Sequence, residues 1–516
     1  MAISSIDFAI ILFYILAMVI MGVWMGKGDK SLDDYLLGGR RLPWWAILGS
    51  IVATETSTAT FLSVPGIAYA EAGDLRFLQI AVGFLIGRMV VSIVLLPMYF
   101  RGDLFTAYQV LQQRFGGATK QTASVLFLVT RNLGDGLRLF LAGVALSKVL
   151  GIGMPTCVVI VGVATILYTF FGGMKAVIWS DCIQFVIYMT GGVVALMLLV
   201  SALDGGLNQW IEFGRSTGRF RVFDFRGPLS FDGAAGESLM AFLSEPYTFW
   251  SGVIGGAVLT LGTHGTDQMM VQRYLCATRQ FDAARALVLS GAVVFIQFAL
   301  FLLLGVALAC YYSSVEPRQF DRGDEVFATY IVDQMPLGLV GVTLAAVFAA
   351  AMSTLSSSLN SSATSATNDL IKPWLVTNDA ESTSQPGDGD SSDPLSDRRL
   401  LKVSRVLTIV FGVIQIAIGI GAIQLASSVV SDALAIAGFT AGVLLGVFLL
   451  GVATRQANQT GTLIGMVVGI LVLAVVKFAT PIAWTWYALI GSIVTFSVGW
   501  LASQFASKMN PPEVVD

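Results

Sequence analysis

Apolar segments long enough to cross a lipid bilayer follow one another along almost the whole chain, and they constrain its fold more than any other feature. Hydrophobic residues make up 55% of the sequence and charged residues 12%, against roughly 25% charged in a typical soluble domain. The mean hydropathy is +0.78. Because backbone polar groups in lipid must be satisfied internally, such segments form helices. We therefore predict an all-α polytopic membrane protein.

Thirteen apolar segments can be delimited to within a few residues. They cover 6–25, 44–70, 75–100, 121–150, 154–171, 177–203, 247–270, 284–311, 327–369, 401–422, 429–452, 461–479 and 484–505. Basic residues follow the odd-numbered segments, and examples are Lys27, Arg101, Lys175, Arg273 and Arg399. Because loops rich in Lys and Arg stay on the cytoplasmic side, we expect a cell membrane protein with its N-terminus outside and its C-terminus in the cytoplasm.

Two long stretches are too polar to lie in the bilayer. Residues 204–246 form a predicted outer loop with some structure of its own. Residues 377–397 are rich in Ser, Asp and Gly, which is typical of a disordered cytoplasmic linker. The sequence has no nucleotide-binding loop, so an ion gradient is the expected source of energy. The expected partners are a small-molecule solute and the lipid bilayer, with no nucleic acid and no obligate protein partner.

Hydroxyl groups are concentrated in the ninth segment. Ser353, Ser356, Ser357 and Asn360 recur at three- and four-residue steps, so they share one face of a helix. In lipid, hydroxyls and backbone carbonyls are the oxygen donors that a singly charged cation needs once it sheds water. This face therefore indicates an ion pathway.

A second polar cluster interrupts the second segment, where six of the seven residues at 54–60 are polar. Unwound backbone at this cluster would free carbonyls for an ion and amides for a solute. The alternative is that the Ser and Thr hydroxyls bond back to their own helix and allow close packing. The presence of Glu55 within the cluster favours the first interpretation.

Charged residues within the apolar segments each cost roughly 2.5–3.5 kcal/mol at a helix centre, so they should face the bundle interior or water. They are Glu55, Arg88, Arg131, Asp135, Arg138, Asp181 and Asp267. Asp135 and Arg138 are spaced to neutralise each other, or else to face a solute. Arg88 and Arg131 could extend to the membrane interface. Asp181 could cap its helix or bind an ion.

Four stretches resemble signatures of the sodium:solute symporter family. They read DYLLGGRRLPWW at 34–45, GGMKAVIWSDCIQ at 172–184, GTDQMMVQRYL at 265–275 and AAMSTLSS at 350–357. The resemblance implies the leucine-transporter fold, with two inverted five-helix repeats that each begin with a broken helix. The repeats would cover 44–203 and 247–452 within one transmembrane domain, with an extra helix and inner loop at 1–43 and further helices at 453–516.

The same resemblance implies where sodium binds. The first site would use the carbonyls of Ala53, Thr56 and Ala350 and the hydroxyls of Ser353 and Thr354. None of these groups titrates near neutral pH, which favours Na+ over a proton. A second site, found in the sialic acid branch of the family, would use Asp181, Ser356 and Ser357, so one or two coupling Na+ ions are expected.

The resemblance also implies a solute site, whose predicted members are Glu55, Ser57, Thr60, Gln79, Asp135 and Arg138. Asp135 stands where the sialic acid branch carries an arginine, and Arg138 follows one turn later. Glu55 stands where relatives carry a neutral residue. These departures suit a hydroxyl-rich sugar or a zwitterion, because carboxylates accept hydrogen bonds from hydroxyls and pair with ammonium groups.

We therefore predict a sodium-coupled secondary active symporter, not an enzyme, that imports a small polar organic solute by alternating access. A sugar or a sialic-acid-like compound is the leading substrate class, and an amino acid or a monocarboxylate is the alternative. The alternatives to a symporter are a transporter-like solute sensor and a sodium-independent uniporter or channel. Oxygen sites paired on two different helices argue against a simple pore.

Overall fold

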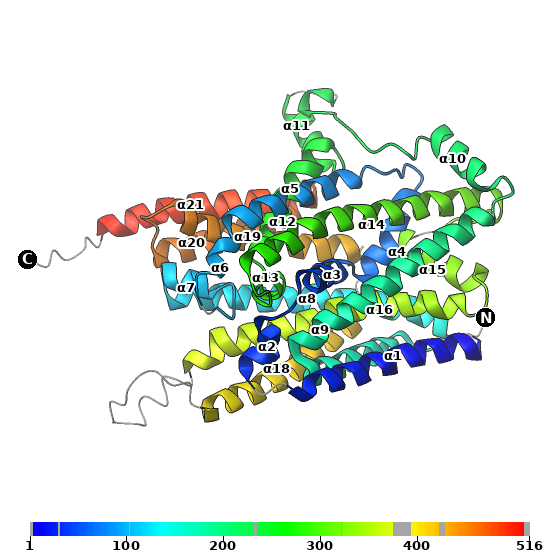
Figure 1. The fold of residues 1–516 in the computed structure, drawn as a ribbon. Coiled ribbons are helices and arrows are strands. Elements are labelled where there is room, and N and C mark those ends of the chain that lie inside the picture. The colour runs from blue at the N-terminus through cyan, green and yellow to red at the C-terminus, as the bar shows by residue number, and fades with distance from the viewer. Residues whose placement is uncertain are drawn as a thin grey trace, which may run out of the picture.

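The fold is a bundle of helices, seen in a computed structural model that describes residues 4–28, 31–102, 104–231, 235–320, 322–374, 394–422 and 429–509 (Figure 1). The elements are α1 (Ser5–Met25), η1 (Gly26–Gly28), α2 (Leu32–Leu37), η2 (Gly38–Arg40), α3 (Trp44–Glu55), α4 (Thr58–Tyr69), α5 (Leu78–Val94), α6 (Leu96–Tyr99), α7 (Gln109–Phe115), α8 (Gly117–Leu150), α9 (Met154–Ser201), α10 (Gly206–Ser216), η3 (Pro228–Ser230), α11 (Ala235–Ser244), η4 (Ser251–Gly255), α12 (Gly256–Gly265), α13 (Gln268–Leu275), α14 (Gln280–Ser314), α15 (Gly323–Gln334), α16 (Leu339–Ser365), η5 (Ala366–Ile371), α18 (Pro394–Gly421), α19 (Val429–Ala453), α20 (Gln459–Ala479), η7 (Trp484–Trp486) and α21 (Tyr487–Met509). Within these ranges, the extended backbone pairing is a single bridge between Leu42 and Ala277.

The second apolar segment is a broken helix. Its halves, α3 and α4, are bent by 58° relative to each other. The backbone leaves the helical region at Thr56, with ψ 89°, and at Ser57, with ψ 170°. Thr56 has a β-branched side chain that bonds back to the Val52 carbonyl at 2.8 Å, so the local sequence disfavours helical continuation. The break lies within the polar cluster that the sequence singled out.

The seventh apolar segment is broken in a similar way. Its halves, α12 and α13, meet at Thr266 and Asp267. The Asp267 side chain caps α13 by accepting a hydrogen bond from the Met269 amide at 2.8 Å. The bridge between Leu42 and Ala277 joins the start of α3 to the end of α13. The two broken helices therefore meet at the ends that the loop charges predict to be cytoplasmic.

Helix α9 contains the predicted fifth and sixth segments in one continuous element. Gly173 separates the two halves with φ 52° and ψ −157°, a backbone conformation that glycine adopts readily and that residues with a Cβ atom rarely adopt. A Cβ atom there would lie 2.5 Å from the Tyr35 carbonyl oxygen. Both the backbone conformation and the close packing of α2 therefore require glycine at this kink.

Helix α16 forms the buried centre of the bundle, where it packs against α9, α8, α1 and α18. In the apolar part of this helix 89% of the residues are buried, compared with 28% in the apolar part of α1. Asp7 on α1 accepts hydrogen bonds from the amides of Gly338 and Gly341 at 2.9 and 2.7 Å, which satisfies the start of α16. The hydroxyl-rich helix is thus enclosed by protein rather than by lipid.

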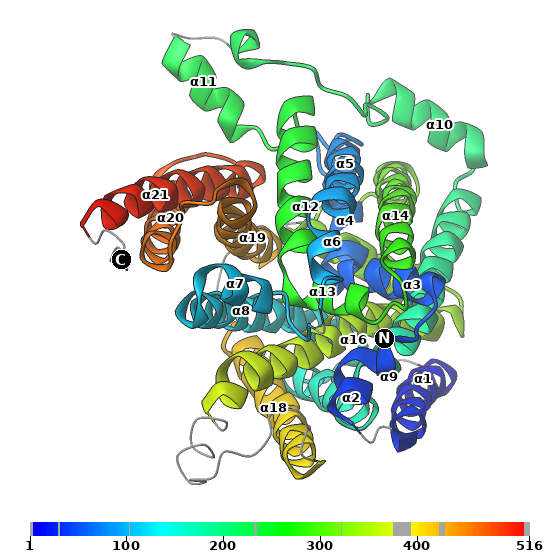
Figure 2. The same cartoon turned by 60° about the vertical axis from the view of Figure 1, so that its left-hand side comes forward.

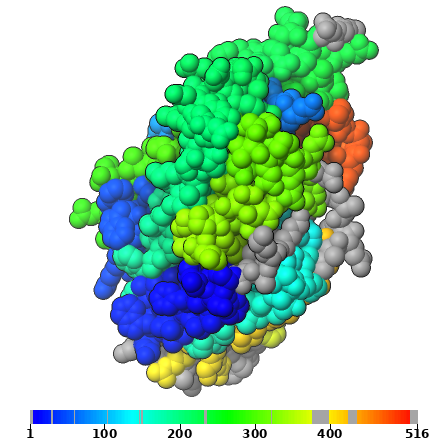
Figure 3. Space-filling model, turned by 90° about the vertical axis from the view of Figure 1, so that its right-hand side faces the viewer, coloured from blue at the N-terminus to red at the C-terminus, as the bar shows by residue number. Residues whose placement is uncertain are grey.

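Eight described helices are long and apolar enough to cross a membrane, and the bent pair of α3 and α4 brings the number to nine. The count of thirteen spans stays a prediction. Helix α1 and the pair α20 and α21 flank the bundle on opposite sides (Figure 2). Figure 3 shows α1 in dark blue at the surface, where Phe13 and Trp24 are largely exposed. Exposed apolar side chains of this kind are suited to contact with lipid.

The predicted linker at 377–397 lies mostly outside the described residues. Its end was placed too far along the chain, because helix α18 already begins at Pro394. Proline is well tolerated in the first turn of a helix, where its missing amide hydrogen has no partner to lose.

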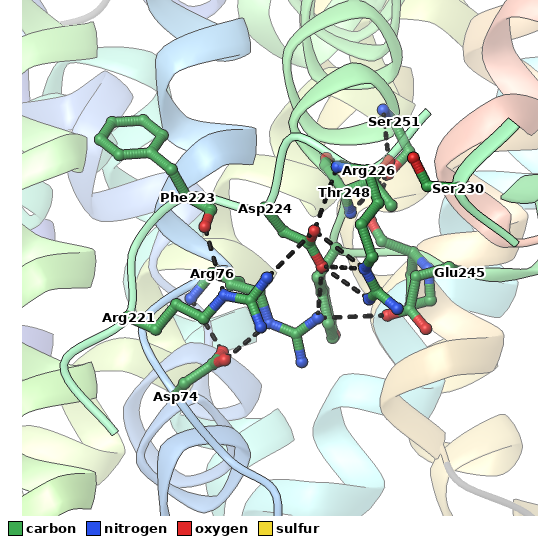
Figure 4. A network of polar contacts seen from close by, with 12 residues as sticks. Asp74, Arg76, Arg221, Phe223, Asp224, Arg226, Ser230, Glu245, Thr248 and Ser251 are labelled. Carbon is green, nitrogen blue, oxygen red and sulfur yellow. Dashed lines mark hydrogen bonds and ion pairs between the residues drawn. The ribbon is translucent and has the colours of Figure 1, made fainter. Parts of the chain in front are cut away.

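The predicted outer loop at 204–246 contains helices α10 and α11, which project from one end of the bundle (Figure 1). Asp224 anchors the segment between them, as Figure 4 shows. Its carboxylate accepts hydrogen bonds from Arg76 Nη1 at 3.0 Å and Arg226 Nη2 at 2.6 Å, and it pairs with Arg221 at 3.1 Å. The loop is therefore tied to the start of α5.

Burial raises the pKa of the Asp224 carboxyl, but hydrogen bonds from Arg226 and the positive charges of Arg221 and Arg226 outweigh this effect and lower the pKa to about 2. An unfolded aspartate has a pKa of about 3.9. The folded loop therefore favours the ionised form. Its stabilisation is complete above about pH 4 and is lost as the pH falls towards about 2.

We expect Asp224→Asn to loosen the outer loop at neutral pH, because the depressed pKa corresponds to about 2 kcal/mol. Amide hydrogen exchange over residues 219–231 should then accelerate roughly tenfold or more. Asp333→Asn is the matched control, because its ion pair with Arg318 is exposed, and it should leave this exchange unchanged. Equal protection in Asp224→Asn and the parent protein would show that the carboxylate does not hold the loop.

Candidate functional site

Oxygen atoms of α3 and α16 meet beside the break between α3 and α4. Ser353 Oγ donates to the Ala53 carbonyl at 3.0 Å and to the Ala350 carbonyl at 3.2 Å. Thr354 Oγ1 donates to the Thr54 carbonyl at 3.1 Å and to the Ala350 carbonyl at 3.4 Å. All five residues are buried. The two helices thus share a compact cluster of neutral oxygens.

The break explains why these carbonyls are available. In a continuous helix, the carbonyls of Ala53 and Thr54 would accept hydrogen bonds from the amides four residues later. The chain leaves the helix at Thr56, and the Ser57 amide donates to the Glu55 carbonyl instead. The hydroxyls of α16 satisfy the freed carbonyls. Hydroxyl and carbonyl oxygens are the donors that sodium prefers, so the residues fit a bound Na+ ion.

The structure brings four of the five predicted ligands together, namely Ala53, Ala350, Ser353 and Thr354. The Thr56 hydroxyl bonds to Gln297 Oε1 at 2.8 Å and to the Tyr188 hydroxyl at 2.9 Å, so this side chain anchors the break to α14 and α9. The Thr54 carbonyl was not predicted as a member. Its position just before the end of α3 is the signal that could have identified it.

Asp181, the predicted centre of the second sodium site, lies in a fully buried polar cluster. Its Oδ2 atom accepts hydrogen bonds from Ser50 Oγ at 2.5 Å and Thr54 Oγ1 at 3.3 Å. Thr54 Oγ1 and Ser357 Oγ lie 3.1 Å apart. The guanidinium of Arg273 lies among them, with Nη2 3.2 Å from Asp181 Oδ2. A side-chain cation therefore already faces this carboxylate.

Three sequence predictions about this region need correction or qualification. Arg273 was counted among the loop cations, but it is fully buried in α13 within the bundle. Asp181 does not cap a helix, because it lies well inside α9 and bonds to side chains of other helices. Ser356 donates to the Ser353 carbonyl at 3.1 Å within its own helix, while Ser357 faces Thr54.

Glu55 forms a mostly buried charged cluster with two partners. One carboxylate oxygen accepts a hydrogen bond from Arg88, and the other lies 3.4 Å from His264 Nε2. Arg88 also donates to Ser290 Oγ at 2.6 Å and is fully buried. The prediction that Arg88 extends to the membrane interface is therefore wrong. This cluster joins α3, α5, α12 and α14.

Asp135 pairs with Arg138 one turn later on α8, and the Arg131 guanidinium lies 3.6 Å from its other oxygen. Arg131 in turn pairs with Asp267 at the break between α12 and α13. Arg131 therefore does not extend to the interface either. Arg131, Arg138, Asp267 and Thr263 line a small, partly open cavity between α8, α12 and α19. This cavity holds one predicted solute-binding residue, Arg138.

Ser57, Thr60 and Gln79 are predicted solute-binding residues that do not line this cavity. Ser57 is buried at the break, and Thr60 lies in the first turns of α4, which packs near α8. Gln79 faces the outer loop, where its amide donates to the Tyr247 carbonyl at 3.0 Å and accepts from the Asp224 amide at 3.0 Å. In this conformation, Gln79 anchors the loop.

Sequence reasoning missed several members of the site. Arg273 and Asp267 both belong to the GTDQMMVQRYL stretch, so that motif carried the missing signal. Gln297 and Ser290 are polar residues within the apolar segment at 284–311, and their spacing of seven residues places them on one face of α14.

These features define a class of protein. A helical bundle with two broken helices and a buried, neutral oxygen site beside one break has the architecture of an ion-coupled secondary transporter. The sequence profile of the sodium:solute symporter family matches residues 35–469. The chain belongs to the sodium:solute symporter family, which consists of sodium-coupled transporters and not of enzymes.

Relatives of known activity match almost the whole chain. The sodium/sialic acid symporter NanT of Aliivibrio fischeri is 28% identical over 99% of this chain and 95% of its own. The sodium/sialic acid symporter SiaT of Proteus mirabilis is 28% identical over 96% of this chain and 94% of its own. The human sodium/iodide cotransporter is 27% identical over 90% of this chain and 68% of its own.

The fold comparison agrees with the sequence comparison. A substrate-bound, outward-open structure of a sodium-coupled sialic acid symporter matches with a TM-score of 0.82 and 25% identity, over 97% of this chain and 98% of that one. A novel sodium site is described in that structure. The nucleobase-cation-symport transporter Mhp1 shares the overall fold, with a TM-score of 0.55 and 14% identity. The predicted leucine-transporter-like fold is confirmed.

We expect Glu55→Ala to destabilise the protein strongly, because it leaves the Arg88 guanidinium buried without its carboxylate. Removing one partner of a buried ion pair typically costs about 3–5 kcal/mol. Thermal unfolding in detergent measures the effect, and the exposed Glu71→Ala serves as the control. The double variant Glu55→Leu/Arg88→Met should recover much of the lost stability. A Glu55→Ala protein as stable as its parent would show that Arg88 finds another partner.

Proposed function

We propose that this protein couples the entry of Na+ to the import of a small polar organic solute, with the ion bound by the oxygens of Ala53, Ala350, Ser353 and Thr354. The observation that carries the proposal is the contact of two α16 hydroxyls with carbonyls freed by the break in α3 and α4. Thr56 completes the predicted set. Bound Na+ would link α3 in the first repeat to α16 in the second. Its binding can therefore stabilise one arrangement of the two repeats over the alternative arrangement.

The proposed solute is a sugar or a sialic-acid-like compound, which is supported by the substrates named for the two bacterial relatives. Its proposed site includes Ser57 and Thr60 at the break, with Asp135 and Arg138 near the cavity beside α8. Asp135 forms an ion pair with Arg138, and Asp267 forms one with Arg131, so the proposed site has little net charge. Within the proposed class, this balance favours a neutral sugar over an anionic compound such as a sialic acid, and it likewise disfavours other monocarboxylates.

The proposed orientation places the N-terminus outside and the C-terminus in the cytoplasm. It is supported by the loop charges that remain after Arg273 is removed from the count, such as Arg279 and Arg399. In this orientation, the loop with α10 and α11 faces outwards and the meeting point of α3 and α13 faces the cytoplasm.

Removal of both site hydroxyls should abolish sodium coupling. We expect Ser353→Ala/Thr354→Ala to lose sodium-driven uptake into proteoliposomes and to lose the rise in unfolding temperature that Na+ gives the parent protein. Ser361→Ala is the matched control, because its buried hydroxyl donates to the Ser358 carbonyl within α16 and has no other partner in the described part of the chain. Sodium-driven uptake that persists in the double variant would contradict the assigned ion site.

The solute itself can be identified by counterflow in proteoliposomes with labelled sugars, sialic acids, amino acids and monocarboxylates. We expect a hydroxyl-rich or zwitterionic compound to exchange in a sodium-dependent manner. Exchange of equal rate with and without Na+ would indicate a uniporter. Solute binding without any exchange would indicate a sensor.

A further inference from the structure

The guanidinium of Arg273 occupies the cluster of residues in which a second sodium ion was predicted. Its Nε atom donates to Ser50 Oγ at 2.8 Å, and Nη1 donates to the Met269 carbonyl at 2.5 Å. Nη2 donates to the hydroxyls of Thr54 and Ser357. The same nitrogen lies 3.2 Å from Asp181 Oδ2. Arg273 therefore contacts two of the three residues predicted to hold the second ion, Asp181 and Ser357.

The charges in this cluster are already balanced. Arg273 and Asp181 are both fully buried, so each needs the other to offset the loss of water. Asp181 Oδ1 is buried and has no hydrogen-bond partner among the described residues. A sodium ion at this oxygen would share one negative charge with the neighbouring guanidinium. Two cations around one carboxylate leave an uncompensated positive charge in a medium of low dielectric constant.

We propose that Arg273 is a tethered cation that takes the place of the second sodium ion, so that this protein couples transport to one Na+ through the first site. This inference rests on the proposed function, because it assumes that Ser353 and Thr354 bind the remaining ion. Arginine suits the role, since its fixed fork of donors can contact Ser50, Thr54 and Ser357 together. It also holds α13 against α3, α9 and α16.

The parent protein provides the first test. Radioactive sodium bound to the purified protein in detergent should titrate to one ion per chain, with a Hill coefficient of one. Two ions per chain would overturn the inference and would indicate that the free Oδ1 atom of Asp181 is a ligand. This measurement needs no variant and no identified solute.

Removal of the tethered charge provides the second test. We expect Arg273→Gln to leave Asp181 without a cation, to lower the unfolding temperature without sodium, and to bind two ions per chain. The additional ion should disappear in Arg273→Gln/Asp181→Asn, which removes the carboxylate charge. Arg273→Lys is the matched control, because it keeps a positive charge and should still bind one ion. A folded Arg273→Gln protein that binds one ion would contradict the proposal.

The two proposals fail in different ways. Loss of sodium binding in Ser353→Ala/Thr354→Ala, with one ion bound by the parent protein, supports both. Two ions in the parent, one of them lost with Asp181→Asn, overturn only the role of Arg273. Sodium binding that is unchanged in Ser353→Ala/Thr354→Ala overturns the proposed function and with it the inference.

Discussion

Freed backbone carbonyls at the break between α3 and α4 are the constraint on which the rest of the structure depends. In a membrane interior, a carbonyl without a partner costs several kcal/mol, so a broken helix requires hydrogen-bond donors from elsewhere. Here Ser353 and Thr354 supply hydroxyls to the carbonyls of Ala53 and Thr54. The hydroxyls must therefore lie on a helix enclosed by protein, which explains why α16 is at the centre of the bundle. The same oxygens can coordinate sodium because they are neutral, polar and close together.

The stability of such a bundle in lipid also depends on ion pairs between its charged side chains. Arginines from α5, α8 and α13 pair with three buried acids, Asp135, Asp181 and Asp267, and with the mostly buried Glu55. Three of these pairs connect different helices, and each neutralises groups that would otherwise be costly in lipid. Two of them also connect the two repeats, since Arg131 pairs with Asp267 and Arg273 pairs with Asp181. A conformational change that separates the repeats must exchange or preserve these pairs, which makes them points of control for alternating access.

Membership of the sodium:solute symporter family and the geometry of the oxygen site agree on sodium coupling. The proposed solute region differs from what the resemblance to the sialic acid branch implies. From that resemblance an arginine would be expected at the position of Asp135, but Arg138 and Arg131 lie on either side of Asp135 and restore the positive charge. The outer loop adds a further connection, because Gln79 and Arg76 at the start of α5 both hold Asp224.

The sequence by itself determined the class of fold, because a run of apolar segments in lipid can only form helices, and it predicted an ion pathway along the hydroxyl-rich face of the ninth segment, because hydroxyls at helical spacing require a polar partner. It also identified the broken helix through the threonine cluster that contains Thr56. Only the tertiary structure decided the partners of the charged residues. Arg88, Arg131 and Arg273 each pair with an acid more than thirty residues away or on another helix, and no local pattern encodes such distances. The role of Asp181 depended on which cation reached it, and the packing of α13 against α3 and α9 placed Arg273 there.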